Sequence, residues 1–179
     1  VGRGSYRLPA HIDRAKFADA WERAIAFHPI LRTRIVLSNV ASQFSRPMQL
    51  VAREGCSGGG TRGHLDCRTM SEYEDPDRSD RMLYNRPLFR CAIVVDDKDQ
   101  DQYTFVWTAH HAIYDGWSFQ LLFQQIEDVF YHDSMPAQPA PYNQFIKYLN
   151  RNSHEETARF WQAQLEGTLP ASLPADLPV

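Results

Sequence analysis

The sequence has few cysteines, no long apolar run and no cluster of basic residues. Its three cysteines, Cys56, Cys67 and Cys91, are odd in number and do not have the spacing of a zinc site. No stretch is long and apolar enough to cross a bilayer, and the first residues do not form a secretory signal. We therefore expect a protein of a reducing, cytoplasmic compartment that does not bind a membrane.

An excess of charge of either sign is absent as well. The 179 residues contain 19 Lys and Arg against 22 Asp and Glu, which gives a net charge of −3. Because binding to a phosphate backbone needs a basic face, this balance argues against nucleic acid as a partner. Hydrophobic residues make up 43% of the chain, enough to bury a core. The length fits one domain, or one large lobe of a two-lobed domain.

Helical patterns occur in four places along the chain. Apolar residues recur at helical spacing after Asp13, which predicts a helix that Asp13 caps and that ends at Pro29. Three further helices are predicted, from Gly116 to near His132 and Asp133, over 142–149 and over 155–165.

Strand-like patterns lie between these helices. Residues 88–95 and 102–110 are strongly apolar, and the polar segment 96–101 between them predicts a hairpin. Residues 6–8 are expected to be the end of a strand, and shorter strands are expected at 31–37 and 49–52. The glycine-rich segment 55–63 lacks the lysine of a phosphate-binding loop and is predicted to be a flexible surface loop. Residues 71–83 are expected to form a short helix or a linker, and residues 168–179 a linker.

The candidate chemistry lies in the segment from His110 to Gly116. If the strand of 102–110 runs into the histidine pair, neighbouring side chains face opposite ways, so His110 and His111 have different surroundings. An imidazole with an ordinary pKa of about 6.5 can take or share a proton near neutral pH. Asp115 stands where a helix begins and can accept backbone N–H groups or pair with an arginine. Gly116 allows a backbone conformation or a close approach that other residues resist.

A pair of adjacent histidines does not by itself establish a site, since ordinary polar residues are the more common explanation. A zinc site made of His110, His111 and Asp115 is unfavourable, because oppositely directed histidines cannot easily share one ion. No fourth ligand is spaced nearby either. We therefore expect no metal at this segment.

The longer pattern resembles a known family. Residues 110–118, His-His-Ala-Ile-Tyr-Asp-Gly-Trp-Ser, resemble the HHxxxDG signature of nonribosomal peptide synthetase condensation domains, in a wording closest to fungal synthetases. Other segments resemble further motifs of this family and follow its order, namely 27–34, 87–90, 141–146 and 160–165. The resemblance extends from about residue 6 to residue 178.

The resemblance implies a fold similar to chloramphenicol acetyltransferase. In that fold two lobes form a V around a tunnel, and each lobe is an α/β (α+β) sandwich, a mixed sheet with flanking helices. Residues 1–179 would be the amino-terminal lobe alone, without the family's opening motif and without the C-terminal lobe.

The resemblance also implies an activity, namely amide (peptide) bond formation between a donor acyl thioester and an acceptor amine. Both substrates would be carried on the 4′-phosphopantetheine arms of carrier domains, beside an adenylation domain, with no cofactor bound directly by this chain. His111 would be catalytic, either as a base or by orienting the amine. His110, Asp115 and Gly116 would support it, and Arg32 is expected to form an ion pair with Asp115.

Several alternatives remain open at this point. An epimerisation domain shares the histidine signature, and a coenzyme-A-dependent acyltransferase is a more distant possibility. A heterocyclisation domain is disfavoured, because it has aspartate in place of both histidines. As an isolated lobe, the chain would be a module that binds a carrier domain without catalysis.

Overall fold

The computed structural model describes residues 1–38, 46–53, 67–73, 82–95 and 102–169. The predicted loop over 55–63 and hairpin turn over 96–101 lie outside these residues, as do most of 71–83 and of 168–179. The chain divides into two compact units, Val1–Pro136 and Ala137–Val179, and each is described by itself.

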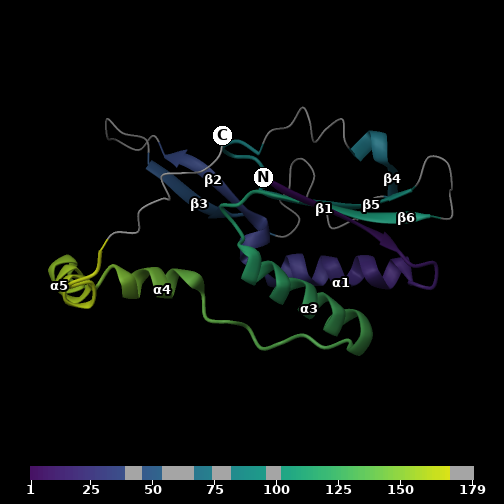
Figure 1. The fold of residues 1–179 in the computed structure, drawn as a ribbon. Coiled ribbons are helices and arrows are strands. Elements are labelled where there is room, and N and C mark those ends of the chain that lie inside the picture. The colour runs from purple at the N-terminus through teal and green to yellow at the C-terminus, as the bar shows by residue number, and fades with distance from the viewer. Residues whose placement is uncertain (39–45, 54–66, 74–81, 96–101, 170–179) are drawn as a thin grey trace, which may run out of the picture. The chain divides into compact units, whose positions relative to one another are not determined.

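A four-stranded sheet is the centre of the first unit (Figure 1). Its strands, in spatial order, are β1 (Gly2–Leu8), β6 (Tyr103–Ala109), β5 (Phe89–Val95) and β4 (Cys67–Thr69). β6 pairs antiparallel with both β1 and β5, whereas β4 pairs parallel with β5. The predicted mixed sheet and the predicted pairing of the two apolar strands are therefore confirmed, and β1 ends at Leu8, as predicted.

A second, two-stranded sheet follows a short 3₁₀ helix. This helix, η1, spans Pro29–Arg32, and the antiparallel strands are β2 (Thr33–Ser38) and β3 (Arg46–Val51). The predicted strand over 31–37 thus began too early, because a proline at the first helical position favours the helical turn. The backbone N–H of Asn85 donates to the carbonyl of Ile35 at 2.7 Å and so attaches β2 to the segment before β5.

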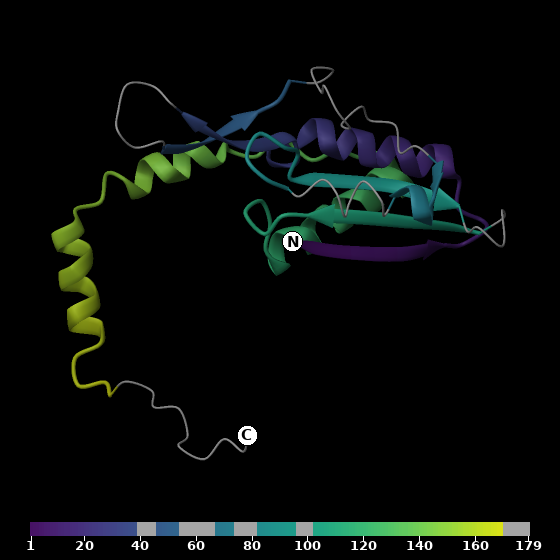
Figure 2. The same cartoon turned by 90° about the horizontal axis from the view of Figure 1, so that it is seen from above.

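Two helices cover one face of the four-stranded sheet (Figure 1 and Figure 2). They are α1 (Arg14–Phe27) and α3 (Gly116–His132). As predicted, Asp13 caps α1 by accepting the backbone N–H of Lys16, and α3 ends before Asp133, which has left-handed backbone angles. Arg23 of α1 donates to the carboxylate of Asp133 at 2.5 Å, which joins the two helices.

Side-chain alternation along β5 and β6 separates two apolar clusters. The larger one lies between the sheet and the helices and includes Phe89, Phe105, Trp107 and Ala109. The opposite face contributes Ala92, Val94 and Val106, which pack with Tyr73. The Tyr73 hydroxyl lies 2.9 Å from the hydroxyl of Thr108, so these two buried hydroxyls satisfy each other.

Trp21 is the central side chain of the larger cluster. It is 0% exposed and stacks on Phe105 of β6, with ring centroids 4.5 Å apart, and on Phe89 of β5, at 5.9 Å. Phe123 of α3 meets the same indole edge-on at 5.7 Å. Aromatic pairs of this kind contribute about 0.5–1.5 kcal/mol beyond the area they bury. Trp21 therefore joins α1, α3 and the sheet.

The second unit contains the two remaining predicted helices, α4 (Tyr142–Leu149) and α5 (His154–Gln164). Ser153 caps α5 by accepting the backbone N–H of Glu156. Across the residues that the structure describes, every helix is too short or too polar to span a bilayer.

We expect Trp21→Ala to lower the free energy of unfolding of the first unit by about 3–5 kcal/mol, because it leaves a cavity between three elements. Urea denaturation followed by circular dichroism measures this change. Trp161→Ala is the matched control, since Trp161 is 55% exposed, and it should change the value by less than about 0.5 kcal/mol. Equal losses from the two variants would contradict the assigned role of Trp21.

Candidate active site

The histidine segment forms the turn between β6 and α3. The backbone N–H of His110 donates to the carbonyl of Leu88 at 2.9 Å, which continues the pairing with the β5 side by one residue. The backbone N–H of Ile113 then donates to the carbonyl of His110 at 3.1 Å and closes the turn. β6 ends at Ala109, one residue before the predicted end of the strand, and both ends of the turn are held by regular structure.

The two imidazoles have different surroundings. His110 is half-buried, and its Nδ1 accepts the backbone N–H of Ala112 at 3.0 Å. His111 is exposed, and its ring stacks on Tyr114 with centroids 4.7 Å apart and planes 25° apart. The hydroxyl of Tyr114 lies 3.4 Å from Nε2 of His111. One imidazole is thus used within the turn, while the other is presented at the surface.

Asp115 is the N-cap of α3. Its carboxylate accepts the backbone N–H of Ser118 at 2.7 Å, and the hydroxyl of Ser118 accepts the backbone N–H of Asp115 at 3.0 Å. This reciprocal pair is a capping box. The pKa of the Asp115 carboxyl lies below its ordinary value, chiefly because the Ser118 backbone N–H donates to it. Asp115 is therefore an anion that fixes the end of the turn to the helix.

The predicted ion pair between Arg32 and Asp115 is wrong. Arg32 donates instead to three backbone carbonyls, those of Ile25 at 3.1 Å, Ala26 at 3.1 Å and Ala52 at 2.6 Å. Carbonyls in the last turn of a helix have no partner within the helix, and the guanidinium of Arg32 supplies one. Among the hydrogen bonds and ion pairs of the described residues, none joins Arg32 to Asp115, whose carboxylate is already engaged by the cap.

The structure also corrects the reason given for Gly116. Its φ is not in the left-handed region, and a Cβ placed there would meet no heavy atom of the structure within 4 Å. The close approach predicted for Gly116 occurs at β1 instead. A Cβ on Gly2 would overlap the hydroxyl of Tyr114, and one on Gly4 would lie 2.5 Å from Nε1 of Trp107.

Tyr114 connects the turn to the core. Its ring lies 4.7 Å from that of Phe119 and 6.1 Å from that of Trp107, and these two rings lie 4.3 Å apart. Tyr114 was not among the residues predicted to support His111. Its position three residues after His111, between the histidine pair and the capping Asp115, is the signal that indicates a contact with the imidazole.

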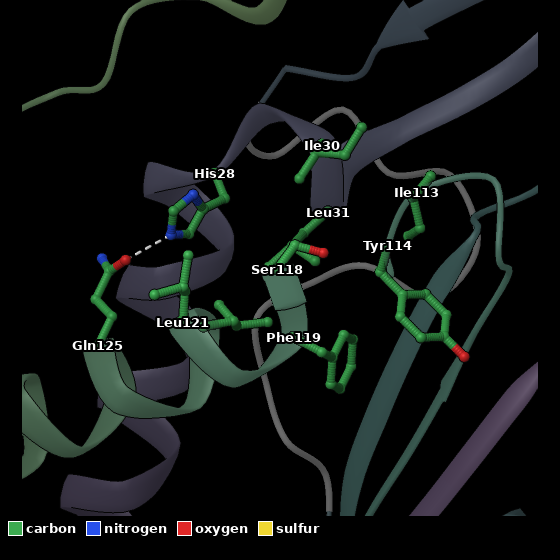
Figure 3. Close-up of a pocket in the computed structure, with 10 residues that line it drawn as sticks. His28, Ile30, Leu31, Ile113, Tyr114, Ser118, Phe119, Leu121 and Gln125 are labelled. Carbon is green, nitrogen blue, oxygen red and sulfur yellow. Dashed lines mark hydrogen bonds between the residues drawn. The ribbon is translucent and has the colours of Figure 1, made fainter. Parts of the chain in front are cut away.

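A pocket of about 210 Å³ lies beside the turn, between η1 and the first turns of α3 (Figure 3). Its lining is mostly apolar and consists of Ile30, Leu31, Ile113, Phe119, Leu121 and Leu122, together with His28, Tyr114, Ser118 and Gln125. His28 and Gln125 hydrogen-bond at 2.6 Å, and Figure 3 shows the ring of Tyr114 pointing away from them.

Other reactive groups add little to this site. Burial raises the pKa of the Cys91 thiol, so it does not form the thiolate that a nucleophile needs. Cys91 packs against the larger cluster as a small apolar side chain. Within the described part of the chain, no group of three His, Cys, Asp or Glu side chains is arranged to hold a metal ion.

The chain is similar to known proteins over most of its length. Residues 4–178 match the family described as "Condensation domain". Nonribosomal peptide synthetase ecdA of Aspergillus rugulosus is 34% identical over 168 residues, and nonribosomal peptide synthetase atnA of Emericella nidulans is 36% identical over 174 residues. These matches cover 93% and 94% of this chain but only 2% of each relative, so the chain spans a small part of their length.

The fold has a counterpart among solved structures. The epimerization domain from the third module of tyrocidine synthetase B superposes with a TM-score of 0.65 at 16% identity. The match covers 99% of this chain and 42% of that chain. At this identity the likeness concerns the fold alone, and it agrees with the predicted mixed α/β architecture.

We expect Asp115→Ala to lower the melting temperature by a few degrees, whereas Asp115→Asn should retain most of the stability, because asparagine caps helices about as well. Because the folded-state pKa of Asp115 is lowered, the contribution of its carboxylate is present above the unfolded pKa of about 3.9 and is lost as the pH falls through the lower folded value. Melting curves at neutral and acid pH measure both effects. A deficit of Asp115→Ala that is equally large in strong acid would contradict this role.

We expect Arg32→Met to lower the free energy of unfolding by about 1.5–3 kcal/mol, because three carbonyls lose a charged donor. Arg32→Lys should recover only part of this, since one ammonium cannot span three separate acceptors. Arg34→Met is the matched control, because Arg34 donates to a single carbonyl, that of Asn85, at 3.3 Å. A loss in Arg34→Met as large as that in Arg32→Met would overturn the assignment; urea denaturation measures both.

Proposed function

The chain belongs to the condensation domain family, and on that premise we propose that it supplies the histidine motif of a peptide-bond-forming site in a nonribosomal peptide synthetase. The single observation that carries this proposal is the exposed imidazole of His111 on a turn in which the side chains of His110 and Asp115 already accept backbone N–H groups. Such a group is free to contact a substrate while the turn keeps its shape.

The proposed reaction joins two carrier-bound substrates. The amine nitrogen of the acceptor attacks the thioester carbonyl carbon of the donor, a C–N bond forms, the C–S bond breaks, and the phosphopantetheine thiol leaves. The amine loses one proton overall, which can pass through the imidazole of His111 to the departing sulfur. A free α-amine has a pKa of only about 7.7–8.0, so a strong base is not required.

His111 has two possible contributions to this reaction. It can accept the amine proton, or it can orient the amine and stabilise the charge of the tetrahedral intermediate. In both cases the imidazole must be held in one position. His110 supports this by accepting the Ala112 N–H, and Asp115 by fixing the start of α3. Gly116 is part of the same motif as the first residue of that helix.

We further propose that residues 1–179 are one lobe of the condensation domain. The 42% share of the matched solved chain supports this. A second lobe would complete the substrate tunnel, and carrier domains would deliver both substrates on 4′-phosphopantetheine, beside an adenylation domain in the cytoplasm. No cofactor bound directly by this chain is needed for the reaction.

We expect His111→Ala in the complete synthetase to slow dipeptide formation by about 10²–10⁴-fold, because a positioned proton-transfer group typically contributes that much. Mass spectrometry of the condensed product on the acceptor carrier measures the rate. His132→Ala, which removes an exposed histidine from the other end of α3, should leave the rate unchanged. An undiminished rate in His111→Ala would refute the catalytic assignment.

Two further arms of the same assay separate the alternatives. If the acceptor is omitted and the donor residue on its carrier changes configuration, the site is an epimerisation site instead. If the 179-residue chain alone forms dipeptide from two loaded carriers, the proposal that it is one lobe of the catalytic domain fails.

A further inference from the structure

We infer that Tyr114 is a positioning residue for His111, whose ring and hydroxyl hold the imidazole in one orientation and one tautomer. This inference rests on the proposed role of His111. Tyr114 occupies a position that the HHxxxDG signature leaves unspecified, so the signature alone gives it no function.

Two contacts reach the imidazole from Tyr114. The rings are nearly parallel, 25° apart with centroids at 4.7 Å, which restricts rotation of the His111 side chain. The tyrosine hydroxyl lies 3.4 Å from Nε2 and can donate to it when that nitrogen carries no proton. In the neutral imidazole this arrangement favours the tautomer with the proton on Nδ1 and a free electron pair on Nε2.

The hydroxyl contact is long enough to be exchanged. Strong protein hydrogen bonds span roughly 2.7–3.2 Å, so a separation of 3.4 Å is a weak bond. A substrate amine that approaches Nε2 can replace the hydroxyl as hydrogen-bond donor. The stack between the rings then continues to hold the imidazole. Tyr114 thus favours an unprotonated Nε2 on His111 and does not prevent a substrate amine from binding there.

Tyr114 is itself held from two sides. Phe119 and Trp107, which are 7% and 8% exposed, pack against its ring. His111, in contrast, is exposed. Among the hydrogen bonds of the described residues, its side chain has Tyr114 as the sole partner. The buried rings of Phe119 and Trp107 thus restrict the ring of Tyr114, and the ring of Tyr114 in turn restricts the imidazole of His111.

Strand β1 supplies an independent observation. Gly2 pairs with Ala109, the last residue of β6, and so lies beside the start of the turn. A Cβ at this position would overlap the Tyr114 hydroxyl and would lie 3.2 Å from its Cζ and 3.8 Å from Nε2 of His111. The hydroxyl of Tyr114 occupies the space that a side chain at Gly2 would fill. β1 therefore defines where the hydroxyl lies relative to Nε2.

A purely structural tyrosine would behave differently when its hydroxyl is removed. If the ring only filled space, Tyr114→Phe would leave His111 unaffected, because phenylalanine keeps the ring and its stacking. The positioning role requires a change in His111 itself. The test must therefore observe the imidazole directly rather than activity or stability alone.

We expect Tyr114→Phe to shift His111 away from the Nδ1–H tautomer. Long-range proton–nitrogen correlation spectra of the chain labelled with ¹⁵N-histidine measure the tautomer of each imidazole. Tyr131→Phe is the matched control, since Tyr131 is a 61% exposed tyrosine in the last turn of α3, and it should leave the His111 signals unchanged. An unchanged tautomer in Tyr114→Phe would overturn the inference.

A double-mutant cycle tests the part played by β1. Gly2→Ala alone should lower the melting temperature and disturb the His111 signals, because its methyl group collides with the hydroxyl. In the Tyr114→Phe background the same substitution should cost clearly less, since the hydroxyl is gone and the nearest ring carbon is Cζ. Additive losses would show that Gly2 and the hydroxyl do not interact.

Kinetics in the complete synthetase distinguish this inference from the proposed function. We expect Tyr114→Phe to reduce kcat several-fold with little change in KM, a much smaller loss than in His111→Ala. If His111→Ala is fully active while Tyr114→Phe still shifts the tautomer, the proposed function fails and the positioning contact stands. If His111→Ala is inactive and Tyr114→Phe changes neither tautomer nor kcat, the positioning inference fails alone.

Discussion

Strand β6 is hydrogen-bonded on both edges, and its register fixes the place of the histidine turn. Phe105, Trp107 and Ala109 all face the helices because side chains alternate along a strand, and β1 and β5 hold this register from either side. A slip of one residue would turn these side chains to the opposite face, and Tyr114 would lose its contact with the ring of Trp107. The position of His111 therefore follows from the packing of a strand that carries no reactive group.

Two sets of polar contacts stabilise the fold in addition to the apolar packing. The capping box of Asp115 and Ser118 fixes the end of the turn to α3, and Arg32 binds two carbonyls at the end of α1 and a third one after β3. Each satisfies backbone groups that a helix end leaves without partners. Both residues belong to motif segments, yet their contacts are with the backbone rather than with a reaction centre. These two motif residues thus stabilise the fold itself.

The sequence was informative where structure depends on local pattern. Asp13 marks the start of α1, the apolar spacing after Gly116 marks α3, and the two apolar strands are placed to within a residue, because periodicity and capping are properties of short segments. The partners of Arg32 could not be predicted, since they depend on which carbonyls remain free once α1 and β3 meet. The same holds for Tyr114, whose surroundings come from β1, β6 and α3 together.

The pairing of Gly2 with Ala109 also has a consequence for the order in which the molecule assembles. β5 and β6 are close in the sequence, whereas β1 and β6 are separated by most of the residues of the first unit. Because ordering a longer loop costs more chain entropy, contacts between distant residues tend to form late in folding. The turn that carries the histidine pair can therefore exist before β1 arrives. We therefore expect the Tyr114 hydroxyl to acquire its final surroundings late in folding, when β1 pairs with β6.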